Sequence, residues 1–275
     1  FPKVPAYKSS NYSRSVSLRH SRSWTSGQHR SLVGPMEHDQ MKLERSQIPF
    51  HELQERLNQA LSKTSEKRVG LLTSITGGEL ATLVLSPKDG TAELMLTPIE
   101  HNKFPSFSTH HAQFHWFERA LFDFFGIVPE GHPRFKHLLL HDQYAQDFFP
   151  LRKIDLPADF KNHLARRYEY LEVKGEGVYE LPVGPIHAGV IEPGHFRFSC
   201  FGETIVNLEI RLGWVHRGVE KRLTEVPWQK AHFVAEAAAS DTALANAFAH
   251  AIAIESILDL EITERAQYLR TIALE

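Results

Sequence analysis

The chain has 275 residues, which is enough for one or two domains with a sizeable hydrophobic core. Its formal net charge is −2, with 42% hydrophobic and 23% charged residues, a balance typical of globular proteins that argues against nonspecific nucleic-acid binding. The single cysteine, Cys200, excludes an intramolecular disulfide and a cysteine-rich zinc or iron–sulfur centre. The most apolar stretch, Ala237 to Leu260, is interrupted by acidic residues, so a membrane role must come through partners.

Residues 1–45 are predicted to be a disordered tail. The first 35 of them contain no Asp or Glu and combine Arg and Lys with many serines, a composition that cannot bury apolar surface. Two interpretations stay open: an Arg/Ser-rich transit peptide, or a solvated extension ahead of a true start at Met36 or Met41.

Residues 46–157 are predicted to form a first, α+β domain. Apolar residues from Phe50 to Leu61 recur at helical spacing after Ser46 or Pro49. A second helix is expected at His110–Phe125, with Gly126 as its stop. Between the two helices, three runs rich in strand-forming residues and separated by turns predict an antiparallel meander: Val69–Ile75, Leu80–Leu85 and Ala92–Leu96.

Residues 158–177 are expected to link this domain to a second, incomplete one at 178–275. A hairpin is predicted around Gly202-Glu203, with strands at Phe196–Phe201 and Thr204–Ile210. Beyond Trp228 the composition predicts one Ala-rich helix through Ile257 and another helix from about Ile262. Because no stop signal precedes Glu275, the sequence is expected to be a fragment.

Histidines at helical spacing are candidate metal ligands. His111 and His115 would share a helix face, but Gln113 stands where a zinc hydrolase needs its general base. His137 and His141 repeat the spacing without a nearby acidic or thiol ligand, so surface or capping histidines are the favoured interpretation. Phosphate-binding glycine loops and a serine-nucleophile elbow are both absent from the sequence.

Three motifs in the first domain occur in a particular order: ERALFDFFGI at 118–127, EGHP at 130–133 and PLRK at 150–153. Taken alone, Glu118, Arg119 and Asp123 would form ion pairs on a helix surface. Together the motifs resemble the 30-kilodalton subunit of respiratory complex I, which implies a domain that docks and shapes its complex without doing chemistry itself.

The second domain carries VGPIHAG at 183–189, EPGHFRF at 192–198 and WVHRGVEK at 214–221. These motifs resemble the start of the large subunit of membrane-bound, group 4 nickel–iron hydrogenases and of the related 49-kilodalton subunit of complex I. The fusion of both modules in one chain is similar to the arrangement in the large subunits of formate hydrogenlyase and hydrogenase 4.

The resemblance places a Cys-x-x-Cys pair shortly after the Arg-Gly-x-Glu motif, where this chain has Ala239 and Thr242. A methyl or hydroxyl group cannot replace a bridging thiolate, so nickel is not expected. Cys200 lies well before this position and is expected to be a buried, inert thiol.

The resemblance also implies roles for residues near the second domain's first loop. His187 and His195 are candidates to hydrogen-bond or protonate a quinone headgroup, because imidazole titrates near neutrality. Glu192 is a candidate proton relay, with a turn carboxylate that caps backbone amides as the alternative. Structural ion pairs are expected from four further residues: Arg197, Arg217, Glu220 and Asp241. For Arg217 and Asp241 two interpretations stay open, a buried ion pair that stabilises the fold or charge coupling toward a membrane arm.

The resemblance therefore implies a subunit of a membrane-associated oxidoreductase complex, held peripherally on the cytoplasmic side by partner subunits. Expected partners are a small iron–sulfur subunit and integral membrane subunits, with electrons passing from the partner's cluster to quinone or a related acceptor. No cofactor is expected on this segment itself, and alone it is expected to be inactive. Two alternatives stay open: a noncatalytic scaffold, and a true hydrogen-evolving nickel–iron subunit.

Overall fold

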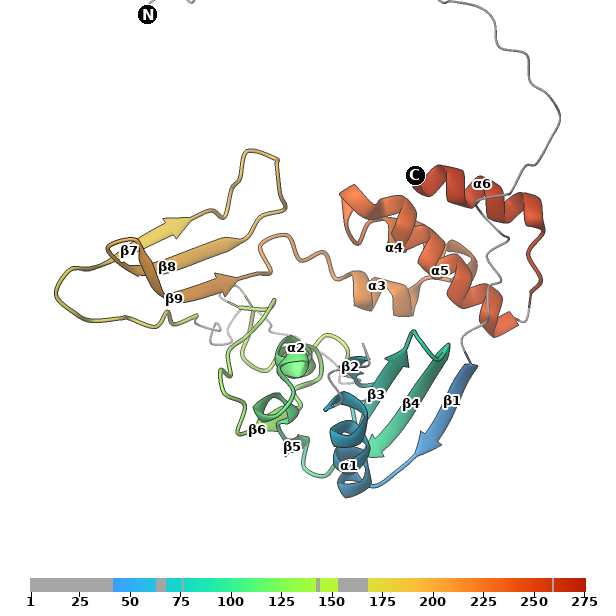
Figure 1. Ribbon diagram of the computed structural model, residues 1–275, viewed down its shortest axis with the longest axis horizontal. Helices are drawn as coiled ribbons and strands as arrows, with labels where there is room; N and C mark the ends of the chain where they lie inside the picture. Colours follow the sequence, from blue (N-terminus) through green and yellow to red (C-terminus); the bar gives the residue numbers. More distant parts are fainter. Residues whose placement is uncertain (1–41, 63–67, 76, 142–143, 153–167, 259) are drawn as a thin grey trace, which may run out of the picture. The chain divides into compact units, whose positions relative to one another are not determined.

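The computed structural model describes residues 42–62, 68–75, 77–141, 144–152, 168–258 and 260–275, all within one compact unit, 39–275. The predicted features at residues 1–41 and most of the expected linker lie outside the described residues. The part of the linker that is described, 168–177, contains no helix or strand and ends in a turn at residues 176 and 177. The fold is α+β, as predicted, and Figure 1 shows its elements along the chain.

The first sheet has four strands in the order β1-β4-β3-β2. The central meander is antiparallel, as predicted, while β1 pairs with β4 in parallel. The prediction that residues 42–45 belong to a disordered tail is therefore wrong, because they pair with residues 91–94 of β4. The strands are β1 (Lys42–Gln47), β2 (Val69–Thr73), β3 (Glu79–Ser86) and β4 (Thr91–Pro98).

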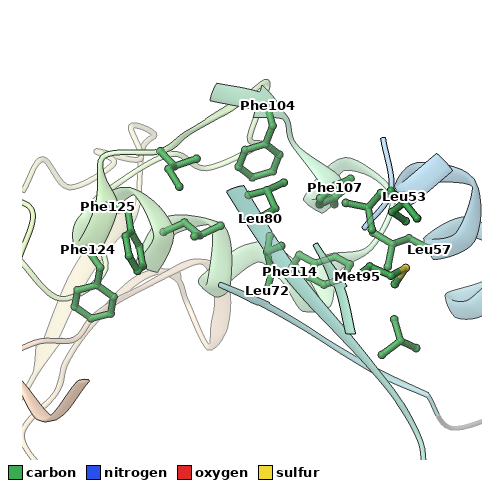
Figure 2. Close-up of a cluster of buried hydrophobic side chains, with 14 of the residues drawn as sticks. Leu53, Leu57, Leu72, Leu80, Met95, Phe104, Phe107, Phe114, Phe124 and Phe125 are labelled. Atoms are coloured by element: carbon green, nitrogen blue, oxygen red, sulfur yellow. The ribbon is translucent and has the colours of Figure 1, made fainter. Parts of the chain in front are cut away.

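Helix α1 (Phe50–Leu61) contributes Leu53 and Leu57 to the hydrophobic core. Leu53 and Leu57, one turn apart, are completely buried, as are Leu80 of β3 and Met95 of β4. Figure 2 shows these leucines and Met95 with the aromatic side chains of the same cluster. The aromatic members come from the segments that follow the sheet: Phe104, Phe107, Phe114, Phe124 and Phe125.

The segment between the sheet and the second helix is more irregular than predicted. Helix α2 (His115–Phe125) starts five residues later than expected, because the 3-10 turns η1 (Phe107–Thr109) and η2 (Ala112–Phe114) precede it. Gly126 ends the helix in the left-handed conformation, with φ of 70°. The short strands β5 (Lys103–Pro105) and β6 (Val128–Glu130) pair in parallel on either side of this segment.

The second sheet contains β7 (Val178–Val183), β8 (His195–Phe201) and β9 (Thr204–Arg211), all antiparallel. The predicted hairpin at Gly202-Glu203 is confirmed. Rows of paired residues across the three strands alternate between apolar and charged. One row contains Leu181, Phe198 and Leu208, and the next contains Pro182, Arg197 and Glu209. One face of the sheet is therefore apolar, and the other carries charged side chains.

The predicted Ala-rich helix is interrupted. Ala239 has extended backbone angles, and the 3-10 turn η5 (Ser240–Thr242) separates two helices, because Ser, Asp and Thr favour turns over helix interiors. No helix in the described ranges is long and apolar enough to cross a membrane. The helical elements of this region are α3 (Val219–Glu225), η4 (Trp228–Lys230), α4 (Ala231–Glu236), α5 (Ala243–Leu258) and α6 (Glu264–Leu274).

Candidate functional site

The loop that joins β7 to β8, residues 184–194, closes on itself through two histidines. His187 Nε2 donates to the carbonyl of Gly194 at 2.7 Å, and His195 Nδ1 donates to the carbonyl of Gly184 at 3.3 Å. Gly184 has φ of 81°, and a Cβ there would lie 2.2 Å from the Gly194 carbonyl oxygen. Glycine is thus required at this position both by conformation and by the close approach of the two loop ends.

These contacts fix which imidazole nitrogen faces the backbone. A nitrogen that faces a carbonyl oxygen must carry hydrogen, so neutral His187 is protonated at Nε2 and neutral His195 at Nδ1. The remaining nitrogen of each ring is then the proton acceptor. The rings themselves pack edge-to-face, His187 against Phe196 and His195 against Tyr170.

A cavity of about 390 Å³ lies beside this loop, and its lining includes Glu192, Arg217 and Glu220. Arg217 Nη2 lies 3.6 Å from Glu192 Oε1, and both side chains are about half exposed. His187 and His195 are not among the residues that line this cavity. The structure thus brings three of the predicted charged residues together and leaves the two histidines at the base of the loop.

Arg217 makes a second contact, since its Nη2 donates to the carbonyl of Ala238 at 3.0 Å. Asp241 is exposed, so the prediction of a buried Arg217–Asp241 pair is wrong: a carboxylate that stays hydrated among alanines needs no partner. Within the described ranges neither Asp241 nor Glu220 forms an ion pair. Arg197 forms an ion pair with Glu180 of β7.

The two positions where the resemblance implies thiolates lie within one turn. The Thr242 N–H donates to the Ala239 carbonyl at 3.3 Å, and Thr242 Oγ1 accepts from Asn246 Nδ2 at 3.3 Å. Cys200 is buried in β8, and the described residues include no group of three or more His, Cys, Asp or Glu that could hold a metal ion. A methyl group at 239 and a hydroxyl occupied by Asn246 at 242 do not fit a nickel–iron centre, which needs thiolate ligands.

The charged residues of the first-domain motif are buried, so the interpretation as surface ion pairs is wrong. Asp123 accepts from His137 Nδ1 at 2.6 Å and from the N–H groups of three consecutive leucines, 138–140. Burial would raise the pKa of Asp123, but the hydrogen bonds from His137 and the backbone outweigh it and hold the pKa below its ordinary value. Asp123 therefore acts as a charged anchor for the segment that follows the helix.

Glu118, one turn earlier, anchors the preceding segment. Its carboxylate accepts from the hydroxyls of Ser106 and Ser108, both at 2.6 Å, and from the Phe107 N–H. Arg119 points to the other side and donates to the carbonyls of residues 136 and 137. The charged residues of the motif thus tie the segments on either side of α2 to the helix.

Glu209 is a buried acid that sequence reasoning missed. Its side chain is almost fully enclosed and accepts from Lys136 Nζ at 2.6 Å, Arg134 Nη2 at 2.8 Å and the Leu171 N–H at 2.6 Å. Burial would raise its pKa, but these donors more than offset that effect and lower it. The alternation of apolar and polar residues along the strands could have indicated this residue, because it places Glu209 directly opposite Arg197 on the charged face of the sheet.

The histidines considered as metal ligands have other contacts. His111 Nε2 lies 2.9 Å from Asn58 Oδ1, and the rings of His115 and His132 pack with centroids 4.6 Å apart. Burial, followed by the charges of His132 and the neighbouring arginines, lowers the pKa of His115 to about 4. His137 is engaged by Asp123, as described above.

Comparison with known proteins assigns the first domain. Residues 55–160 match the family model of the 30 Kd subunit of respiratory-chain NADH dehydrogenase. The chain is 30% identical over 203 residues to formate hydrogenlyase subunit 5 of Escherichia coli, covering 70% of this chain and 35% of that protein. It is 31% identical over 184 residues to hydrogenase-4 component G of the same organism, covering 66% of this chain and 33% of the relative. The C/D subunit of NADH-quinone oxidoreductase from Phocaeicola vulgatus is 28% identical over 262 residues, which cover 83% of this chain and 49% of the relative.

Fold and relatives together define this chain as a homologue of subunits of oxidoreductase complexes. More particularly, residues 55–160 match the 30 Kd subunit family of respiratory-chain NADH dehydrogenase, and the chain as a whole is similar to hydrogenase and C/D-type subunits. The chain spans between a third and a half of the length of these relatives.

Proposed function

We propose that this chain belongs to a membrane-associated oxidoreductase complex and takes part in electron transfer from an iron–sulfur cluster in a small partner subunit to quinone or a related acceptor. In this proposal the chain is peripheral, held by partner subunits that include integral membrane proteins, on the cytoplasmic side. The names of the relatives, which are subunits of NADH-quinone oxidoreductase, formate hydrogenlyase and hydrogenase 4, support an assignment of this class.

The observation that carries the proposal is the position of Glu192. Its carboxylate lies on the rim of the 390 Å³ cavity and faces the guanidinium of Arg217, while the loop beneath it is closed by His187 and His195. A half-exposed carboxylate at a cavity can take a proton from water and pass it to a reduced acceptor. His195 serves as the second proton carrier through Nε2, since Nδ1 is engaged by the Gly184 carbonyl.

The test is Glu192→Gln in the full-length subunit within its complex, with a short-chain quinone as acceptor. The amide keeps the shape of the side chain but cannot take up and release a proton, so turnover is expected to fall about 100-fold, the lower range for loss of a general acid–base. Glu203→Gln, in the exposed hairpin turn, removes an acid of the same kind outside the cavity and is expected to leave turnover unchanged. Equal rates for the two variants would contradict the proposal.

A noncatalytic scaffold is the second candidate, favoured by Ala239 and Thr242 at the thiolate positions and by the hydrogen bonds that tie the segments on either side of α2 to this helix. If it is correct, changing both His187 and His195 to alanine leaves electron transfer and quinone binding intact in the complex. The hydrogen-evolving alternative predicts stoichiometric nickel in the full-length subunit, which elemental analysis measures directly.

A further inference from the structure

The charged pair at the cavity contributes little to stability. The side chains of Arg217 and Glu192 are 44% and 47% exposed, and their nearest nitrogen and oxygen lie 3.6 Å apart. This separation is too long for a hydrogen bond, and exposed ion pairs of this kind are weak because water screens them. The pair therefore needs an explanation other than holding the fold together.

Arg217 links two segments that both line the cavity. The same Nη2 that faces Glu192 in the β7–β8 loop donates to the carbonyl of Ala238, which directly precedes the turn at residues 239–242. Glu192 and Ala238 are both lining residues, so the guanidinium spans the cavity wall between them. A planar guanidinium with several fixed donors can hold a carbonyl and a carboxylate at once, which a lysine ammonium does less well.

Arg217 cannot itself carry protons at neutral pH, because a guanidinium does not release one. Its neighbour Gly218 has φ of 67° and is the N-cap of α3, so Arg217 lies directly before this helix. The side chain of Arg217 is thus held at the Ala238 carbonyl, while among the described residues the carboxylate of Glu192 meets only the charge of Arg217. Glu192 is the member of the pair that is free to approach an acceptor.

We infer that Arg217 is a positioning residue for Glu192: bound to the carbonyl of Ala238, it holds the carboxylate at the cavity wall. This inference rests on the proposed function, since it gives Arg217 a role only if Glu192 passes protons. It predicts that the two residues act as one unit in turnover and that the effect of Arg217 is transmitted entirely through Glu192.

The experiment is a double-mutant cycle in the full-length subunit within its complex, with a short-chain quinone as acceptor. Arg217→Gln is expected to lower kcat about 10- to 100-fold with little change in KM, the range for a misplaced catalytic group. Arg217→Lys is expected to retain intermediate turnover, and added guanidinium ion to restore part of the loss in Arg217→Gln. Arg222→Gln, an exposed arginine on α3, removes the same charge and is expected to behave as the parent.

The double-mutant cycle distinguishes the role of Arg217 from the proposed role of Glu192 on which it rests. The expected result is that the double variant of Glu192→Gln and Arg217→Gln is no slower than Glu192→Gln alone, and that only Arg217→Gln, not Arg222→Gln, changes the pH profile. If the two losses multiply, Arg217 acts independently and the inference is overturned while the proposed function stands. If Glu192→Gln has no effect, the proposed function itself fails. If Arg217→Gln does not fold, Arg217→Lys replaces it in the same double-mutant cycle.

Discussion

The ammonium group of Lys136 lies 2.6 Å from a carboxylate oxygen of Glu209, a residue 73 positions further along the chain. Arg134 reaches the same oxygen, and the Leu171 N–H reaches the other one. The segment after α2 and the segment at 171 therefore converge on one buried carboxylate of β9. This arrangement leads to the first prediction.

Replacing Glu209 by Gln is expected to destabilise the full chain by about 2 kcal/mol. The amide cannot neutralise the two cations, but the loss is smaller than the ~3–5 kcal/mol typical of a fully buried pair, because Arg134 and Lys136 retain contact with water. Glu172→Gln removes an exposed ion pair with Lys174 and is expected to cost less than about 0.5 kcal/mol. Urea unfolding measures both, and equal midpoints would contradict the assignment of Glu209 as an anchor.

A second prediction concerns the closed loop. Gly184→Ala is expected to destabilise the chain by about 3 kcal/mol and to increase hydrogen exchange at residues 184–195, because the new methyl group would meet the Gly194 carbonyl and the His187 ring. Gly189→Ala is the matched control: its φ of 78° is equally unusual, but no atom lies within 4 Å of the added carbon. It is expected to cost only about 1 kcal/mol of backbone strain. Similar exchange patterns in the two variants would show that close approach is unimportant.

A third prediction concerns His115. Its pKa in the fold is about 4, below the ordinary value of 6.5, so the unfolded chain binds the proton more readily than the folded one. The stability that depends on neutral His115 is therefore complete above pH 6.5 and is lost as the pH falls toward 4. His115→Phe keeps a ring against His132 and is expected to flatten the decline in urea midpoint between about pH 7 and pH 5. His110→Gln, at an exposed position, is expected to preserve it. If the urea midpoint of His115→Phe falls with pH as steeply as that of the parent, His115 is not the cause of the decline.

Periodic features were predictable from the sequence, because they record burial directly. The meander, the Gly202 hairpin and the stop at Gly126 follow from strand alternation and from the tolerance of glycine for positive φ. Strand β1 was not predictable in this way, since a parallel partner lies about 50 residues away and leaves no local turn signal.

In the candidate site, too, the contacts within one short segment were predictable and the contacts between distant segments were not. Glu192 and the two histidines belong to one short segment, so their neighbourhood followed from sequence proximity and family resemblance. The partner of Arg217 did not, because the choice between Glu192 and Asp241 depends on how a loop and a turn meet in space. An acid among alanines suggested burial of Asp241, but a 3-10 turn exposes it to solvent.

Asp123 binds main-chain amides, and this has a consequence for how its family can diverge. The three N–H groups that it accepts belong to residues 138–140, and every amino acid except proline supplies such a group. The anchor itself makes no demand on the leucine side chains, whose burial is a separate constraint, since Leu140 belongs to the hydrophobic core. What the carboxylate of Asp123 requires of this segment is the absence of proline at three successive positions, a requirement that a search for shared side chains would overlook.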